Sequence, residues 1–443
     1  MAFQDGVLCK RGIRSDVLWT NPLLYRDPFR RTPIALDTRA LLATQYAPRA
    51  ALDALSERRL ADLFKAASYI PFWKSRIDTA HAPADILRSL PVTSKKNFIG
   101  RHVDEYTRPR DRARSRKDHT SGSTGEPFEF YFDWRAELRS FGIRERMVRA
   151  ATRGQALPVV CMRARPSPGF FFGNYVLFYL RGYNSVRHRL PEFIEFAKRF
   201  PHGFAVYAYT SSVVELARAL HDSGTKLPIR AALATGEGVR ESERALVTEG
   251  LGASLFLTYA THELKWLTFE CEYHRAHVNE EYVHVEVVDE GGAPLPSKSE
   301  GKVVATAFDN YAMPFIRYDT GDRGTLSEEP CPCGRTLRTL SVSGRQTDRI
   351  EVPGRRIPVF DVSTSFDVFP HAVRQFQIVQ KGPCAFSIRV VAGPEFEFRK
   401  EDLRTRLRGL IHPDADISWE VVASIPEVRT GKALVYINEQ GRG

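Results

Sequence analysis

Residues 203–234 read GFAVYAYTSSVVELARALHDSGTKLPIRAALA, and an apolar stretch, an amphipathic stretch and a second apolar stretch follow one another there. We expect strands at residues 203–209 and 229–234, with a helix at residues 212–223 between them. Strands that are joined through a helix usually run parallel in one sheet. This unit therefore predicts a parallel sheet with helices packed on it.

The same alternation extends along most of the chain before residue 278. Further strands are expected at residues 158–162 and 254–259, and further helices at residues 50–68 and 190–199. Beyond that point, residues 282–288 and 301–307 alternate apolar and polar side chains, which is typical of antiparallel strands. The sequence as a whole predicts an α/β fold.

The length of 443 residues exceeds what one core usually supports, so we expect two domains. The first, residues 1–345, is predicted to be a large N-terminal domain of mixed, largely parallel sheets with helices. The second, residues 346–443, is predicted to be a small, mobile α+β domain, with strands at 376–379, 386–391 and 418–422 and helices at 362–369 and 400–410.

Composition limits the partners that the chain can have. Its formal net charge is +11, which suits small polyanions, although a merely solvated basic surface is the alternative. The densest basic stretch, residues 108–117, has no interleaved aromatic side chains, so nucleic acid is not an expected partner. No apolar run is long enough for a membrane span, and no secretory signal is visible, so we expect a cytoplasmic protein that does not use a membrane.

The most informative motif is His119-Thr120-Ser121-Gly122-Ser123-Thr124-Gly125-Glu126-Pro127. Its glycines let the backbone curl, and its hydroxyl and backbone N–H groups can surround a chain of phosphates. It differs from the P-loop because no Gly-Lys-Ser/Thr follows the glycines. A Ser/Gly surface loop is the alternative interpretation.

Three polar segments follow this loop along the chain. Residues 315–322, FIRYDTGD, are expected to close a strand with a polar turn, where Asp322 can accept both hydroxyl hydrogens of a ribose and Arg317 adds charge. Residues 343–350, SGRQTDRI, form a polar joint before the small domain. Residues 425–432, IPEVRTGK, are expected to present Lys432 on a flexible turn.

In this order the motifs resemble those of the adenylate-forming superfamily, and the branch of the phenylacetate–CoA ligases above all. The branch markers are YIPFW at residues 69–73, LPVTSK at residues 90–95, and a phosphate loop that ends in Glu126-Pro127 without a lysine. The resemblance extends from residue 55 to about residue 438. It implies that the chain activates a carboxylic acid with ATP and Mg²⁺ to an acyl-adenylate, and then passes the acyl group on, most often to coenzyme A.

The resemblance also implies roles for individual residues. The ATP phosphates are expected at Thr120, Ser121, Gly122, Ser123 and Thr124, and the adenine at Gly236, Glu237, Gly238, Tyr259, Ala260 and Thr261.

Other residues are expected to act on the ribose, the metal and the reacting groups. Asp322 binds the ribose, Arg345 reaches the nucleotide from the domain joint, and Glu263 holds Mg²⁺. Lys432 bridges the carboxylate and the α-phosphate, and we group it with Glu263 and His262 as the catalytic residues.

Two departures from the family pattern stand beside these residues. Ala260 replaces a glycine, and His262 replaces a serine or threonine next to the phosphates, which can alter the choice of acceptor or slow the reaction. Thr347 also replaces an acidic residue or lysine at the joint between the domains. The alternatives are an enzyme that uses an amine or a carrier protein as acceptor, and a non-catalytic relative that binds nucleotide.

A second set of residues has the spacing of a structural zinc site. Cys271 and His274 form a Cys-x₂-His pair, and Cys331 and Cys333 can complete a tetrahedral set of ligands. His277 competes as the nitrogen ligand. The alternative is a buried thiol next to a tight Cys-Pro-Cys-Gly turn.

The acid itself is not identified by the sequence. The aromatic residues at 169–175 and 207–212 can form the walls of a pocket for a flat acid, including an aromatic one, although core packing explains such runs more often. Arg163 and Arg165 can meet a carboxylate or the phosphates of coenzyme A, or simply face solvent.

Overall fold

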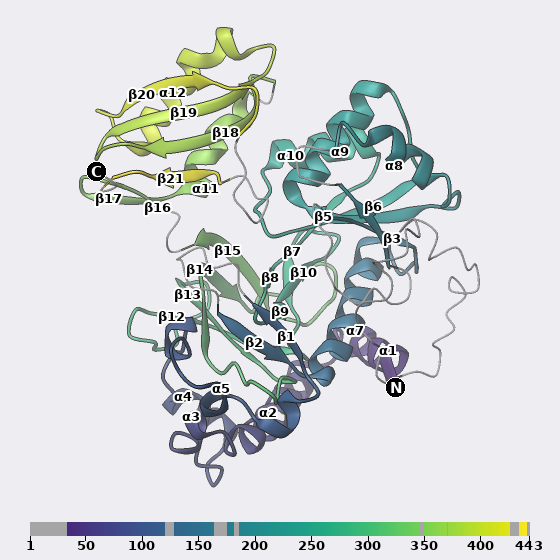
Figure 1. Ribbon diagram of the computed structural model, residues 1–443, viewed down its shortest axis with the longest axis vertical. Coiled ribbons are helices and arrows are strands. Elements are labelled where there is room, and N and C mark those ends of the chain that lie inside the picture. Colours follow the sequence, from purple (N-terminus) through teal and green to yellow (C-terminus); the bar gives the residue numbers. More distant parts are fainter. Residues whose placement is uncertain are drawn as a thin grey trace.

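A five-stranded parallel sheet lies at the centre of the large domain in the computed structural model, which describes residues 33–119, 128–163, 175–180, 186–345, 349–369, 371–425 and 434–440 (Figure 1). Its strand order is β4-β3-β5-β6-β7, and every neighbouring pair is parallel. The bounds are β3 Val159–Arg163, β4 Tyr175–Tyr179, β5 Phe204–Tyr209, β6 Ile229–Thr235 and β7 Leu255–Thr258. The predicted α/β class is confirmed.

Helices cover both faces of this sheet because successive residues of a strand point to opposite sides. On one face, Val206 and Ala208 pack in a core with the helices α8 Leu190–Ala197, α9 Thr210–Ser223 and α10 Glu241–Leu251. On the other face, Ala205 and Tyr207 belong to a second core that includes the helix α7 Trp134–Ala151 (Figure 1). The sequence analysis did not predict α7.

A six-stranded antiparallel sheet lies next to the parallel one, in the order β10-β11-β15-β14-β13-β12. Its strands are β10 Thr268–Glu270, β11 Ala276–Val278, β12 Val283–Val288, β13 Glu300–Ala307, β14 Tyr318–Ser327 and β15 Thr339–Arg345. Two small hairpins lie between the sheets and α7, β1 Arg116–His119 with β2 Glu129–Phe132, and β8 Ala260–Thr261 with β9 Lys265–Trp266. The predicted change to antiparallel strands after residue 278 is confirmed.

Six helices at the start of the described chain occupy the lower part of the molecule in the view of Figure 1. They are α1 Pro33–Thr44, α2 Arg49–Ala67, α3 Pro71–Lys74, α4 Pro83–Ser89, α5 Val103–Tyr106 and α6 Pro109–Arg112. An ion pair without exposed surface joins this region to α7 and the antiparallel sheet, because Arg146 donates to Glu281 at 2.7 Å and to the carbonyl of Leu41 at 3.2 Å.

The C-terminal part of the chain has a core of its own, built from buried residues between Ile350 and Ile417. Its four-stranded sheet has the order β20-β19-β18-β21. The elements are β16 Arg349–Val352, β17 Arg355–Pro358, α11 Val359–Ser363, β18 Val373–Gln380, β19 Ala385–Ala392, α12 Phe396–Ile411, β20 Asp416–Val421 and β21 Tyr436–Asn438.

Polar contacts connect this part to the helices of the parallel sheet. The hydroxyl of Ser242 donates to Asp367 at 2.6 Å, and Arg240 lies 3.4 Å from the same carboxylate. Arg218 donates to the carbonyl of Arg374 at 2.9 Å.

Candidate functional site

Three of the residues that we expected around a nucleotide meet where β7 ends. Tyr259 follows β7, and its phenol donates a hydrogen bond of 2.5 Å to Asp322 on β14. Burial and the negative charge of Asp322 raise the pKa of Tyr259 well above its ordinary value, so the phenol stays protonated and keeps donating. Arg345 lies opposite Asp322 on β15, with its Nε 3.9 Å from the carboxylate.

Glu263 lies in the turn between β8 and β9, close to this group. It accepts a 3.2 Å hydrogen bond from the phenol of Tyr318, the first residue of β14. Burial raises the pKa of the Glu263 carboxyl group. The turn is closed by Thr261, whose hydroxyl accepts from the Leu264 N–H at 3.0 Å, and His262 is exposed at its tip. A carboxylate and an exposed imidazole thus lie together at the edge of the two sheets.

The segment Gly236-Glu237-Gly238 follows β6, the strand beside β7. Gly236 has φ +79°, a backbone conformation that other residues rarely adopt. Glu237 accepts hydrogen bonds from the backbone N–H of Ser211 at 2.8 Å and from its hydroxyl at 3.3 Å, so the segment contacts the start of α9. It lies at the carboxyl edge of the parallel strands, where open α/β sheets bind ligands.

Several expected site residues lie outside the described residues. They are Thr120, Ser121, Gly122, Ser123, Thr124 and Lys432, together with residues 169–174 of the predicted acyl pocket. The structure does describe β1 and β2, the strands that precede and follow the hydroxyl-glycine loop in the sequence.

The structure corrects the interpretation of residues 315–322. They do not close a strand, because β14 begins at Tyr318 and continues through Asp322 to Ser327. Arg317 offers no charge to a ribose, since it is buried and pairs with Glu286 at 3.1 Å while it donates to the carbonyls of Leu90 and Gly292. Its role is structural.

A group of charged side chains lies between the β1–β2 hairpin, α7 and β9. Arg116 bridges Asp118 and Glu137, with 2.7 Å to each carboxylate. Lys265 lies 3.9 Å from Asp118, and its Nζ is 4.0 Å from the ring centre of Phe132. Burial, with the nearby charge of Arg116, lowers the pKa of Lys265 to about 8. The sequence analysis did not single out these residues.

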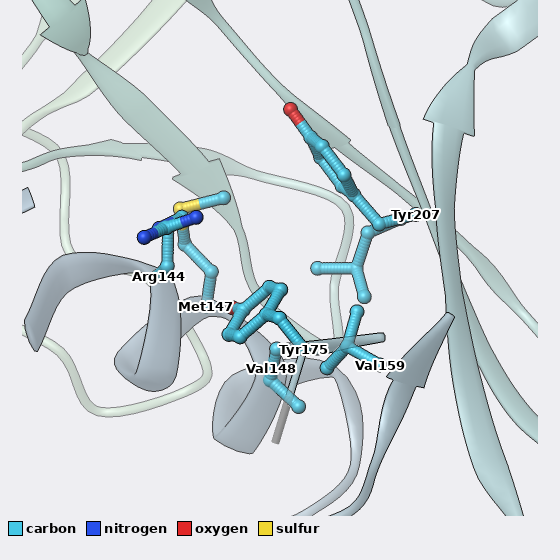
Figure 2. Close-up of a pocket in the computed structure, with 7 residues that line it drawn as sticks. Arg144, Met147, Val148, Val159, Tyr175 and Tyr207 are labelled. Atoms are coloured by element: carbon cyan, nitrogen blue, oxygen red, sulfur yellow. The ribbon is translucent and has the colours of Figure 1, made fainter. Parts of the chain in front are cut away.

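A small cavity lies between α7 and the parallel sheet (Figure 2). Its volume is about 10 Å³. It is lined by Arg144, Met147 and Val148 of α7 and by Val159, Tyr175, Tyr207 and Leu233 of the sheet. Tyr175 and Tyr207 belong to the two segments that we expected to form an acyl pocket, so one residue of each segment lines the cavity.

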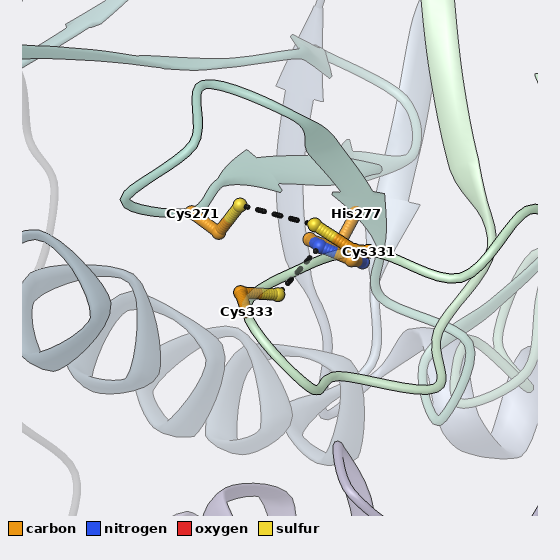
Figure 3. Close-up of side chains that lie close together, drawn as sticks. All are labelled: Cys271, His277, Cys331 and Cys333. Carbon is orange, nitrogen blue, oxygen red and sulfur yellow. Dashed lines mark hydrogen bonds between the residues drawn. The ribbon is translucent and has the colours of Figure 1, made fainter.

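The antiparallel sheet brings three of the four predicted metal ligands together with His277, the residue that we named as the competing nitrogen ligand (Figure 3). The ligand atoms of Cys271, His277, Cys331 and Cys333 all lie within 4.8 Å of one another. The Sγ atoms of Cys271 and Cys331 are 3.7 Å apart, and Cys333 Sγ is 3.3 Å from His277 Nε2. Three thiols and one imidazole at these distances fit a tetrahedral zinc site.

The imidazole in this cluster is that of His277 and not that of His274, which we expected there. His274 points away, with its Nδ1 3.3 Å from Glu270 and 3.0 Å from Arg244. His277 lies 2.9 Å from the carbonyl of Leu337 through Nδ1, which leaves Nε2 facing the thiols. Burial lowers the pKa of His277 to about 4, so the imidazole is neutral, as a metal ligand must be.

Comparisons with known proteins identify one matching domain family and similar ligases. Residues 351–439 match the CapK C-terminal domain family. The chain is 27% identical over 363 residues to a phenylacetate–coenzyme A ligase of Thermus thermophilus, a match that covers 75% of this chain and 79% of that protein.

Solved structures show the same fold. A 2-hydroxyisobutyryl-CoA ligase in its postadenylation state is 16% identical, with a TM-score of 0.72 over 89% of this chain and 91% of that one. The same ligase in its thioesterification state is 17% identical and gives a TM-score of 0.58, over 89% of this chain and 92% of that one.

Fold, site and relatives together define an adenylate-forming ligase. Among these enzymes the chain is similar in sequence to phenylacetate–coenzyme A ligase. Within the described residues, no helix is both long and apolar enough to cross a bilayer.

Proposed function

We propose that the chain activates a carboxylic acid with ATP and Mg²⁺ and then transfers the acyl group to coenzyme A. In the first step, a carboxylate oxygen attacks the α-phosphorus and the bond to pyrophosphate breaks, which gives the acyl-adenylate. In the second step, the thiol sulfur attacks the acyl carbon, the bond to AMP breaks, and the thiol gives up its proton. The observation that carries the proposal is the convergence of Tyr259, Asp322, Glu263 and Arg345 at one edge of the two sheets.

Each of these residues has a task that suits its surroundings. Asp322, held by the Tyr259 phenol, accepts the ribose hydroxyls, and Arg345 adds a positive charge beside it. Glu263 is the residue that would hold Mg²⁺, which neutralises charge on the phosphates. We assign the phosphate contacts to residues 120–124 and the bridging ammonium to Lys432, which reduces the repulsion between two anions.

The two domains are arranged as we would expect for the first step, the formation of the acyl-adenylate. The TM-score to one ligase is higher in its postadenylation state than in its thioesterification state. We place the domain boundary between residues 345 and 346, just before the separate C-terminal core. Asp367, with its contacts to Ser242 and Arg240, holds the small domain on the helices of the large one.

We further propose that Cys271, His277, Cys331 and Cys333 hold a structural zinc ion. Backbone N–H groups of Tyr273 and Arg335 point at the sulfurs of Cys271 and Cys333, at 3.4 and 3.5 Å, and such donors stabilise thiolates. All four side chains can serve as ligands, so no coordination position is left for a substrate.

Pyrophosphate release with Mg-ATP, measured over a panel of aryl and alkyl acids with and without coenzyme A, tests the function. Release that requires an acid and increases with coenzyme A is the expected result. Release with an acid but without a response to coenzyme A would assign an amine or a carrier protein as acceptor. No release with any acid, in protein that binds ATP, would contradict the proposal and favour a non-catalytic nucleotide-binding relative.

A further inference from the structure

Helix α7 carries a row of side chains that contacts the β8–β9 hairpin and lines the small cavity next to the parallel sheet. Ser140, Arg144, Met147 and Val148 are spaced by three or four residues, so they lie on one side of the helix. The indole N–H of Trp266 on β9 donates to the hydroxyl of Ser140 at 2.8 Å. The helix is thereby joined to the β8–β9 hairpin that carries Glu263.

The same tryptophan connects the hairpin to the cavity of Figure 2. Its ring lies edge-on against Tyr207, with 5.9 Å between the ring centres. Tyr207 lines the cavity together with Arg144. Trp266 therefore connects the hairpin that carries Glu263 with Tyr207, which lines the cavity together with Arg144.

Arg144 is held in place without a carboxylate partner among the described residues. Its Cζ lies 4.3 Å from the ring centre of Phe141 and 4.8 Å from that of Tyr175, so aromatic rings fix the guanidinium. Its Nε is buried and has no hydrogen-bond acceptor in the described part of the chain. A buried donor without an acceptor is rare in folded proteins and calls for a ligand or a water molecule.

The other residues that line the cavity provide no hydrogen-bond acceptor as strong as a carboxylate. Met147, Val148, Val159 and Leu233 are apolar. Burial raises the pKa of Tyr207, so its phenol is protonated. The volume of about 10 Å³ has room for one water-sized group and not for a further ring.

We propose that Arg144 is a specificity-determining residue, and that the acid substrate carries a compact oxygen acceptor, a hydroxyl or a second carboxylate, at the end away from the reacting carboxylate. This inference rests on the proposed function, because it assigns the cavity to the acyl group of the activated acid. The acceptor occupies the water-sized space and takes the hydrogen bond of Nε. An unsubstituted acid leaves that donor unsatisfied, so it binds less tightly.

The test compares acids that share a skeleton, namely benzoate, hydroxybenzoates and benzenedicarboxylates, in pyrophosphate release with the full-length enzyme. We expect wild type to prefer an oxygen-bearing acid by at least about tenfold in kcat/KM, as one hydrogen bond to a charged group implies. Arg144→Met should reduce that preference about 10- to 100-fold, and Arg144→Lys should restore part of it for the dicarboxylates. A response to the dicarboxylates alone identifies the acceptor as anionic.

Arg149→Met is the matched control. Arg149 belongs to the same helix but donates to Glu145 at 2.9 Å and does not line the cavity, so its replacement should leave the preference unchanged. A wild-type preference for benzoate, or an equal loss for both kinds of acid in Arg144→Met, would overturn the inference and assign Arg144 to an ordered water.

The same acids also separate this inference from the proposed function. If no acid supports pyrophosphate release, the function fails, and binding is then measured by the shift in melting temperature. A shift with oxygen-bearing acids in wild type that is lost in Arg144→Met and kept in Arg149→Met would sustain the inference. No such shift would contradict it.

Discussion

The buried ion pair of Arg146 and Glu281 allows a quantitative test of how the large domain is held together. Neither side chain is exposed, at 0% and 2%, and the pair joins α7 to the segment between β11 and β12. Arg146→Met leaves the carboxylate of Glu281 buried without its cation, and removes the Arg146 donor from the Asn279 side-chain oxygen. Breaking such a pair from one side typically costs ~3–5 kcal/mol.

The free energy of unfolding in urea, followed by tryptophan fluorescence of the large domain, measures this cost. A loss of ~3–5 kcal/mol corresponds to an increase of about 10² to 10³·⁵ in the unfolding constant. Removing both charges in Arg146→Met/Glu281→Leu should recover more than half of the loss, because no isolated charge then remains buried.

A surface pair on the same helix provides the control. Arg149→Met removes the i,i+4 pair with Glu145, which is partly exposed, so its cost should stay within ~0.5 kcal/mol. A loss below ~1 kcal/mol for Arg146→Met, or a double variant no more stable than the single one, would show that the reasoning from burial is wrong.

Three further predictions concern the metal, the reaction and pH. Elemental analysis of the reduced wild type should find one equivalent of zinc, and zinc-free wild type would refute the site. His277→Ala should lose this zinc, whereas His274→Ala and Cys384→Ser should retain it. Lys432→Ala should slow ATP–pyrophosphate exchange about 10²- to 10³-fold with ATP binding nearly intact, and surviving exchange would exclude Lys432. Burial lowers the pKa of His284 to about 4 from 6.5, so the unfolded chain binds the extra proton and stability is lost as pH falls from about 6.5 toward 4. His284→Gln should make stability less dependent on pH in that range, and an unchanged slope in urea titrations would count against this assignment.

The sequence predicted those parts of the fold in which local pattern and burial agree. The strands β5 and β6 are continuous apolar runs because helices cover both of their faces. Helix α7 escaped prediction because inward positions are occupied by Arg144 and Arg146, so no simple apolar stripe marks its buried side. Only the acceptors and rings supplied by distant segments make those arginines tolerable inside the domain.

The cluster of cysteines and His277 shows the same limit of prediction from the sequence. Cys-x₂-His spacing favoured His274, but the register of the β10–β11 hairpin decides the matter by pairing His277 with Phe269. His274 has φ +54° and turns toward Glu270 instead. Likewise, the segment 318–322 is rich in turn residues, yet pairing with β13 and β15 keeps it in a strand. Such tertiary pairings have no local signal in the sequence.

A metal ion bound by the four proposed ligands would also constrain the order in which the chain can fold. Cys271 and Cys331 are 60 positions apart, and the strands β11, β12, β13 and β14 lie between them. A metal ion held by both ends closes a loop of that length, and a permanent link there would remove about 4 kcal/mol of chain entropy from the unfolded state. During synthesis, Cys271 and His277 cannot share a metal ion with Cys331 and Cys333 until the chain after β14 has been made. Binding of a metal ion by all four residues therefore requires that the chain through β14 has been made, whereas β15, the strand between β11 and β14, comes only after the last cysteine.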